Sequence, residues 1–357
     1  MMTAKRRHVF MNLAVTIFLV LCESVNVTTP TALRASGLRI SGKFGFSHLE
    51  AGTLTAFFGG QESIPVIATP ATRVAFDGAN IWVTSNNTNS VAKLASSDGK
   101  VLGTFAVGSK PMGVAFDGVN IWVTSPSTNS VTKLDPSNGT ELGTFGVGSS
   151  PVGVAYDGAN IWVTNSDAGS VTKLRASDGK LLGTFAVGGG AGAVIFDGTS
   201  IWVVNGNSSS VTKLRPGDGK VLGTFVLGTN PLGVASDGTN IWVACSGSGN
   251  VTKLRASDGA VLGTFAVGST PTGVTFDKAN IWVTNTGSDS VTKLRASDGA
   301  VLGTFSGVPS PGAVAFDGTS IWVLNYDGGY ISKLSADDGK VLGSFGLVGV
   351  AGPRGGD

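Results

Sequence analysis

The sequence predicts an all-β protein built as one seven-bladed β-propeller, with four antiparallel strands in each blade. The first observation is a 40-residue repeat, marked by seven Trp residues at one phase: Trp82, Trp122, Trp162, Trp202, Trp242, Trp282 and Trp322. The second is that Asp-Gly or Asn-Gly pairs, which favour tight hairpin turns, separate short apolar runs inside each copy. The composition agrees, because Gly is abundant and only 13% of residues are charged.

One copy, residues 111–145, shows how each strand is predicted. Strands are expected at 113–116, 121–125, 130–134 and 142–145, where β-branched and aromatic residues lie between turn signals. In the second strand, Ile121 and Val123 point to one face and Trp122 points to the other. Both faces of the strand therefore carry large apolar side chains. Each blade must pack between two neighbouring blades to bury them.

Seven such copies close a ring that leaves no long strand edge exposed. An open solenoid is the alternative, but it would need polar end repeats, and the last copy ends in the same apolar pattern, 342–345. The stretch 49–58 resembles a further outer strand. We expect it either to pair at the seam between the first and last blades or to cover that seam.

The regions outside the repeat predict export. Lys5, Arg6 and Arg7 precede an apolar run at 9–21, which is shorter than the roughly 20 residues of a membrane span. We therefore expect a signal peptide at 1–24, a lead-in segment at 25–69, the propeller at 70–349 and a tail at 350–357. The protein would be periplasmic, extracellular or on the cell surface. Lipidation at Cys22 and an uncleaved anchor are the alternatives.

Composition and motifs argue against several classes of function. The net charge is +2 and no basic tract occurs beyond the extreme N-terminus, so nucleic acid is not an expected partner. His8 and His48 are the only histidines, and both precede the repeat. A Ser-His-Asp or Cys-His catalytic arrangement and a His/Cys metal site are therefore not expected within the propeller. We predict no catalytic residue, no metal and no cofactor.

Three regular series of residues are interpreted as structural. The Asp residues five positions before each Trp are expected to cap their own Asp-Gly turns rather than form a carboxylate cluster. The Trp residues are expected to fill the core between blades rather than stack on sugars. The Lys residues at Lys93, Lys133, Lys173, Lys213, Lys253, Lys293 and Lys333 are expected to lay their stems over apolar neighbours, near a Trp face. With Arg175, Arg215, Arg255 and Arg295 they could instead form a basic arc for an anionic polymer.

The copies differ most in two sets of loops, the loop between the second and third strands and the connection from one blade to the next. In a propeller these loops share a face, and variable loops on a rigid scaffold commonly carry binding residues. Weak packing constraint is the alternative reason for the variation. The predicted ligand-binding residues on this face are Lys110, Asn165, Asp167, Asn205, Asn230, Asn285, Asp289, Asn325, Tyr326 and Asp327. Such groups suit a glycan, a peptide or a protein.

The motifs Ile-Trp-Val-Thr-Asn, Ser-Val-Thr-Lys-Leu and Pro-x-Gly-Val-Ala-Phe-Asp-Gly resemble those of the YVTN-type β-propeller repeat family. They are also similar to the wider group that includes NHL propellers and virginiamycin B lyase. The resemblance covers about 280 residues and implies the propeller fold. A lyase of that kind would call for a His general base and acidic metal ligands at the axial face, and the repeat contains no His.

Three functional hypotheses follow. The first is an exported, non-enzymatic propeller, expected to be a monomer, that binds a protein or glycan on the cell surface through the variable loops. The second is an enzyme similar to virginiamycin B lyase or to lactonases. The third is a structural cell-surface module. Near-identity of the blades favours the first and third, since catalysis usually makes a few blades distinctive.

Overall fold

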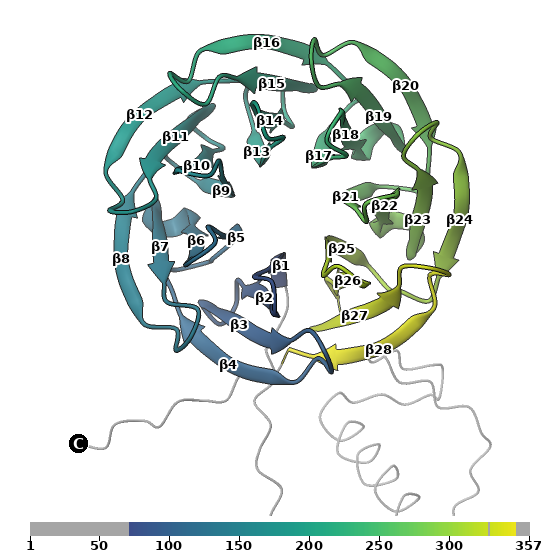
Figure 1. Ribbon diagram of the computed structural model, residues 1–357, viewed down its shortest axis with the longest axis horizontal. Helices are drawn as coiled ribbons and strands as arrows, with labels where there is room; N and C mark the ends of the chain where they lie inside the picture. The colour runs from purple at the N-terminus through teal and green to yellow at the C-terminus, as the bar shows by residue number, and fades with distance from the viewer. Residues whose placement is uncertain (1–70, 328, 348–357) are drawn as a thin grey trace, which may run out of the picture. The chain divides into compact units, whose positions relative to one another are not determined.

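Seven four-stranded antiparallel sheets stand around a common axis in the computed structural model, which describes residues 71–327 and 329–347 (Figure 1). Each sheet uses four consecutive strands, called A to D from the axis outward, so each 40-residue copy forms one blade. Strand A lies nearest the axis and strand D forms the outer wall (Figure 1). The predicted fold class is confirmed. The predicted signal peptide, the lead-in segment and its stretch 49–58, and the tail lie outside the described residues.

The strands of the seven blades follow one plan. Blades one to four comprise β1 (Ala71–Phe76), β2 (Asn80–Ser85), β3 (Ser90–Ala95), β4 (Val101–Ala106); β5 (Val114–Phe116), β6 (Ile121–Ser125), β7 (Ser130–Leu134), β8 (Glu141–Gly146); β9 (Pro151–Tyr156), β10 (Asn160–Asn165), β11 (Ser170–Arg175), β12 (Leu181–Ala186); β13 (Ala191–Phe196), β14 (Ile201–Asn205), β15 (Ser210–Leu214), β16 (Val221–Val226). Blades five to seven comprise β17 (Pro231–Ser236), β18 (Asn240–Cys245), β19 (Asn250–Arg255), β20 (Val261–Ala266); β21 (Pro271–Phe276), β22 (Asn280–Asn285), β23 (Ser290–Arg295), β24 (Val301–Ser306); β25 (Pro311–Phe316), β26 (Ser320–Asn325), β27 (Tyr330–Ser335), β28 (Val341–Gly346).

Helix is almost absent from the described residues. Three B–C loops form a single 3-10 turn, namely η1 (Pro126–Thr128), η2 (Ser246–Ser248) and η3 (Thr286–Ser288). Within residues 71–327 and 329–347, no helix has the length and apolar character that a membrane crossing requires.

The core lies between blades. Trp82 is fully buried and packs with Ile121 and Val123 of the next blade. Ile81, on the opposite face of β2, packs with Trp322 of blade seven. The same pattern therefore fills the seam between the last and first blades. Because every described strand D belongs to its own blade's sheet, side-chain packing and not a shared strand joins the described ends.

Each Trp is held by the Asp of its own A–B turn. Asp77 accepts the indole N–H of Trp82 at 2.7 Å, and its other oxygen accepts the backbone N–H of Ala79 and Asn80 at 2.9 and 2.6 Å. The indole bond recurs in all seven blades at 2.7–2.8 Å. The predicted capping role of this series is confirmed. The Asp also satisfies a buried donor that would be costly to leave unpaired.

The hydrogen bonds that these Asp residues accept determine the direction in which their pKa values shift. Partial burial would raise the pKa of Asp157, but hydrogen bonds from the Trp162 indole, from Asn160 and from the backbone outweigh burial and hold the pKa below 3.8. The same balance lowers the pKa of Asp77, Asp237, Asp277 and Asp317. The folded protein therefore favours the ionised form of each.

The Lys series joins each blade to the next. Each ammonium lies over the Trp ring of its own blade at 4.9–5.6 Å from the ring centroid. Each also donates to a backbone carbonyl in the C–D turn of the following blade at 2.6–2.8 Å. Lys333 makes this bond to Ser96 O, which links blade seven to blade one and closes the ring. The predicted structural role of these Lys residues is confirmed.

Candidate functional site

The B–C loops and the blade-to-blade connections lie on one face and bond to each other. Ser166 N in a B–C loop donates to Ser150 O in the preceding connection at 2.9 Å, and Tyr326 N donates to Ser310 O in the same way. We call this surface the rim. It consists of the loops 86–89, 126–129, 166–169, 206–209, 246–249, 286–289, 326–327 and 329, and of the connections 107–110, 147–150, 187–190, 227–230, 267–270 and 307–310.

Side chains at the end of several B–C loops fix the rim in place. Asn89 Oδ1 accepts the backbone N–H of Lys110 at 2.9 Å, and Asp289 Oδ1 accepts that of Ser310 at 2.7 Å. Where the loop ends differently, Ser208 Oγ accepts from Gly189 N at 2.8 Å. The loops are thus ordered by their own hydrogen bonds, so the varying side chains stand on fixed backbone.

The rim also concentrates unusual backbone. Ten non-glycine residues with positive φ are found in the described chain, and all but Lys278 belong to the rim: Asn89, Lys110, Asn129, Ser150, Ser209, Asn230, Thr270, Asp289 and Ser310. Left-handed backbone is uncommon for such residues and is unfavourable for a β-branched one such as Thr270. It gathers at binding and catalytic sites more than elsewhere, which draws attention to this face.

The structure divides the ten predicted site residues into two groups. Lys110, Asp167, Asn230, Asp289 and Asp327 are exposed on the rim, and Tyr326 is half-buried there. Asn165, Asn205, Asn285 and Asn325 are the last residues of their B strands and have no exposed surface. These four Asn side chains therefore do not meet solvent in this structure.

The buried amides serve the interior. Asn165 Nδ2 donates to Ser170 Oγ at 3.1 Å and to Thr172 Oγ1 at 2.9 Å on the neighbouring strand, and Asn285 and Asn205 make the equivalent bonds. Asn325 Nδ2 donates instead to Pro309 O at 2.8 Å. The four buried Asn side chains therefore hydrogen-bond to residues directly beneath the rim or within it and hold its backbone in place.

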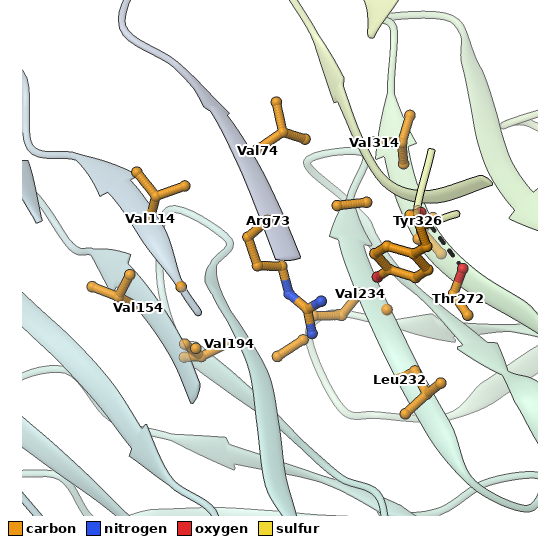
Figure 2. A pocket seen from close by; sticks show the side chains of 18 residues that line it. Arg73, Val74, Val114, Val154, Val194, Leu232, Val234, Thr272, Val314 and Tyr326 are labelled. Carbon is orange, nitrogen blue, oxygen red and sulfur yellow. Dashed lines mark hydrogen bonds between the residues drawn. The ribbon is translucent and has the colours of Figure 1, made fainter. Parts of the chain in front are cut away.

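A cavity of about 330 Å³ lies at the centre of the rim face, lined by the A strands of all seven blades (Figure 2). Its wall includes Leu232, Thr272 and Gly312, each the second residue of its A strand and so just below the rim. The remainder is mostly Val, Gly and Ala. Tyr326 reaches the cavity from the last B–C loop, with its ring over Gly312, where an added Cβ would overlap the ring.

Among the residues that the structure describes, Arg73 is the one charged residue in the cavity lining, and sequence reasoning missed it. Its guanidinium projects into the cavity from β1 (Figure 2). The other six copies place a small residue at this phase: Gly113, Gly153, Ala193, Gly233, Gly273 and Ala313. This exception at an otherwise small position was the available signal.

The geometry of the outer wall bears on the basic arc that the sequence offered as an alternative. The Lys residues of the proposed basic arc bond between blades, and the four Arg residues each form an exposed ion pair with an Asp three positions on, at 2.8–3.2 Å. At these positions the outer wall therefore carries paired positive and negative charges rather than a continuous positive surface. Among the described residues, no group of three or more His, Cys, Asp or Glu side chains is placed to hold a metal ion.

Comparison with known proteins supports a propeller repeat protein. A family model described as outer membrane protein assembly factor BamB matches residues 127–280. No curated protein sequence gives a significant match.

Among solved structures, hydrazine synthase from Kuenenia stuttgartiensis aligns with a TM-score of 0.68 at 18% identity, over 79% of this chain and 99% of that chain. A streptogramin B lyase gives 0.64 at 19% identity, over 74% and 93%. Virginiamycin B lyase from Staphylococcus aureus gives 0.65 at 16% identity, over 76% and 97%.

The fold and these matches place the chain among the seven-bladed β-propeller repeat proteins. Within that class it is similar in fold to the virginiamycin B lyase propellers, as its repeat motifs predict, and at these identities the likeness concerns the fold alone.

Proposed function

We propose that this protein is an exported β-propeller that binds a protein or glycan partner of the cell envelope through the rim. The observation that carries the proposal is that variation between copies gathers on one ordered face. The Asp of each A–B turn, the Asp-Gly or Asn-Gly pair of each C–D turn and the Lys contacts between blades recur in all seven copies. The rim instead combines Lys110, Asp167, Asn230, Asp289 and Asp327 on fixed backbone. Exposed polar groups on ordered loops suit recognition of a polar surface.

The family match favours a protein partner over a glycan. The matching model is named for a factor in outer membrane protein assembly, and residues 127–280 span the middle blades of this propeller. A partner of that kind would also agree with the export expected from residues 1–24. A glycan is the other outcome that the test below can return.

The test compares the native protein with a rim variant whose substitutions already occur in sibling copies. Lys110→Ser takes the residue found at 150 and 310, and Asp167→Asn and Asp327→Asn take the residue found at 87 and 207. Retention from a cell-envelope extract and binding to a glycan array are measured for both proteins. We expect the rim triple variant to lose at least tenfold in binding while keeping its melting temperature.

Lys278→Gly provides the matched control on the opposite face, because the other six copies carry Gly at that phase. This variant should bind as the native protein does. Equal binding by the rim variant, or loss of binding by Lys278→Gly alone, would contradict the proposal.

The competing hypothesis is a lyase, favoured by the fold similarity to streptogramin lyases. Replacement of a single His gives the catalytically inactive form of the Staphylococcus aureus virginiamycin B lyase that has been solved with quinupristin. The propeller repeat of this chain has no His at all. Incubation with quinupristin and divalent metal, followed by chromatography, should return quinupristin unchanged, and a linear product would favour the lyase instead.

A further inference from the structure

We propose that a recess on the side of blade two binds a primary alkylammonium group, and that Glu141 is the residue that pairs with its charge. The recess has a volume of about 300 Å³ and lies along the outer strands β7 and β8, beside the end of β4 in blade one. Four hydroxyl residues and one acid line it, namely Thr128, Ser130, Thr132, Thr144 and Glu141. The inference goes beyond the rim proposal and does not rest on it.

Glu141 is the only Glu in the repeat, and it replaces an aliphatic residue. The other six copies carry Val or Leu at this phase: Val101, Leu181, Val221, Val261, Val301 and Val341. On a regular strand, Glu141 and Thr144 would point to opposite faces. The pairing of β7 with β8 shifts register beside Glu141, as a β-bulge does, and Thr144 Oγ1 donates to Glu141 Oε1 at 2.8 Å. The carboxylate is thereby held against the hydroxyl groups of the recess.

The two Thr hydroxyl protons nearest the carboxylate are used inside the protein. Thr144 gives its proton to Glu141, so it can only accept in its 3.0 Å contact with Thr132. Thr132 therefore donates to Thr144. Both hydroxyls keep lone pairs but have no proton left for a ligand.

The hydroxyls at the rim end of the recess are ordered in the same way. Thr128 Oγ1 donates to Ser125 O at 3.3 Å, so it accepts in its 2.7 Å contact with Ser130, and Ser130 is the donor. All four hydroxyl protons of the recess are thus engaged. The side chains that line the recess present hydroxyl lone pairs and a carboxylate to a ligand.

Blade two also lacks a donor that sibling blades supply to these hydroxyls. In blades three, four and six, an Asn at the end of strand B donates to the equivalents of Ser130 and Thr132 at 2.9–3.3 Å. Blade two has Ser125 instead, directly behind Gly108 of the recess wall. Ser125 Oγ is fully buried and has no hydrogen-bond partner among the described residues. The lone pairs of Ser130 and Thr132 are therefore not used by an amide as they are in the siblings.

A set of acceptors with one carboxylate selects a ligand that is both a donor and a cation. A primary ammonium has three N–H donors and no acceptor, and its bond to a carboxylate is charge-assisted. Ala106 and Val107 add apolar surface for methylene groups, and about 300 Å³ is at the lower end of the range for small-molecule sites. Within the described part of the chain, no group of three or more His, Cys, Asp or Glu is placed to hold a metal ion. The ammonium belongs either to a free amine or to a Lys side chain of a peptide.

Binding is measured by calorimetry at pH 7 with pentylammonium and with pentyltrimethylammonium, which has the same charge but no N–H donor. We expect pentylammonium to bind about tenfold more tightly, and its binding to weaken as salt is raised. An acetylated and amidated tripeptide with a central Lys forms the second arm. Tighter binding of the tripeptide than of pentylammonium would identify a peptide as the source, and weaker binding would identify a free amine.

Glu141→Gln is the decisive variant, because it keeps the shape of the side chain and removes the charge. It should lower pentylammonium affinity about tenfold, and Glu141→Val, the residue of five sibling copies, should do the same at an unchanged melting temperature. Ser125→Asn supplies the donor of the sibling blades and should also weaken binding, whereas Ser125→Ala should leave it unchanged.

The rim triple variant alters none of the residues that line the recess, so it should bind pentylammonium normally, and the two proposals can fail separately. Loss of pentylammonium binding in that variant would contradict the assignment to the recess. Equal binding of the two ammonium ions, unchanged affinity in Glu141→Gln, or tighter binding of calcium than of pentylammonium would overturn the proposal. Absence of binding at about 20 mM pentylammonium would do so too.

Discussion

Asp157→Asn should lower the free energy of unfolding by about 2–3 kcal/mol, as measured by urea denaturation. The substitution keeps the shape of the side chain and replaces one acceptor oxygen with an NH₂ donor. That donor would face the indole N–H of Trp162, which is fully buried and now bonds to Asp157 Oδ2 at 2.7 Å. A buried donor without an acceptor loses its hydrogen bonds to water and gains none in the protein. The expected effect is therefore large.

Asp178→Asn is the matched control, because the same chemical change is made at an exposed acid. Asp178 pairs with Arg175 at 3.2 Å, and both side chains are about half exposed. Exposed ion pairs contribute little to the free energy of unfolding, so the control should change that quantity by less than about 0.5 kcal/mol. Equal decreases in the free energy of unfolding for the two variants would show that the Asp–Trp bond stabilises the blade no more than an exposed ion pair does.

Lys253→Met should lower the free energy of unfolding by about 2–3 kcal/mol, because it removes a contact between two blades rather than one within a blade. Lys253 is 6% exposed, and its ammonium donates to Ala296 O at 2.7 Å and Ser297 O at 2.9 Å in the next blade. It also lies 4.9 Å from the Trp242 ring centroid. Methionine fills similar space but leaves both carbonyls without this donor and removes the cation–π contact.

Lys220→Met serves as the comparison, since Lys220 is exposed in the turn just before the outer strand β16. It should leave the urea midpoint unchanged within error. If Lys253→Met were also neutral, the buried ammonium would add no net stability between blades, as happens for some buried ion pairs when an apolar residue replaces them.

The fold could be predicted from sequence because one pattern was repeated seven times. Any single Ile-Trp-Val segment is ambiguous, but Trp82 and its six equivalents fix the phase of every strand and turn. The roles of the regular Asp and Lys residues also followed, since each has a local partner at fixed spacing. Sequence did not determine how the ring closes. Among the described residues, packing of Ile81 with Trp322 and the bond from Lys333 to Ser96 join the last and first blades, and the stretch 49–58 lies outside those residues.

The candidate site was less predictable because exposure at a strand end depends on three-dimensional packing. Asn165 and Asp167 are two residues apart, yet the first ends its strand inside the interior and the second is exposed on the rim. Arg73 was missed for a related reason. It lies within an A strand, where the repeat looks structural, and only the ring geometry brings seven A strands around one cavity.

The central claim is that the rim is the face through which the propeller recognises its partner. Amide hydrogen exchange, measured with and without a cell-envelope extract, tests it most directly because every blade reports on its own loops. Protection confined to the B–C loops and the blade-to-blade connections, with strands β4, β8, β12, β16, β20, β24 and β28 unchanged, is the result that we predict. Protection on those outer strands or on the A–B and C–D turns, with the rim unaffected, would contradict the account.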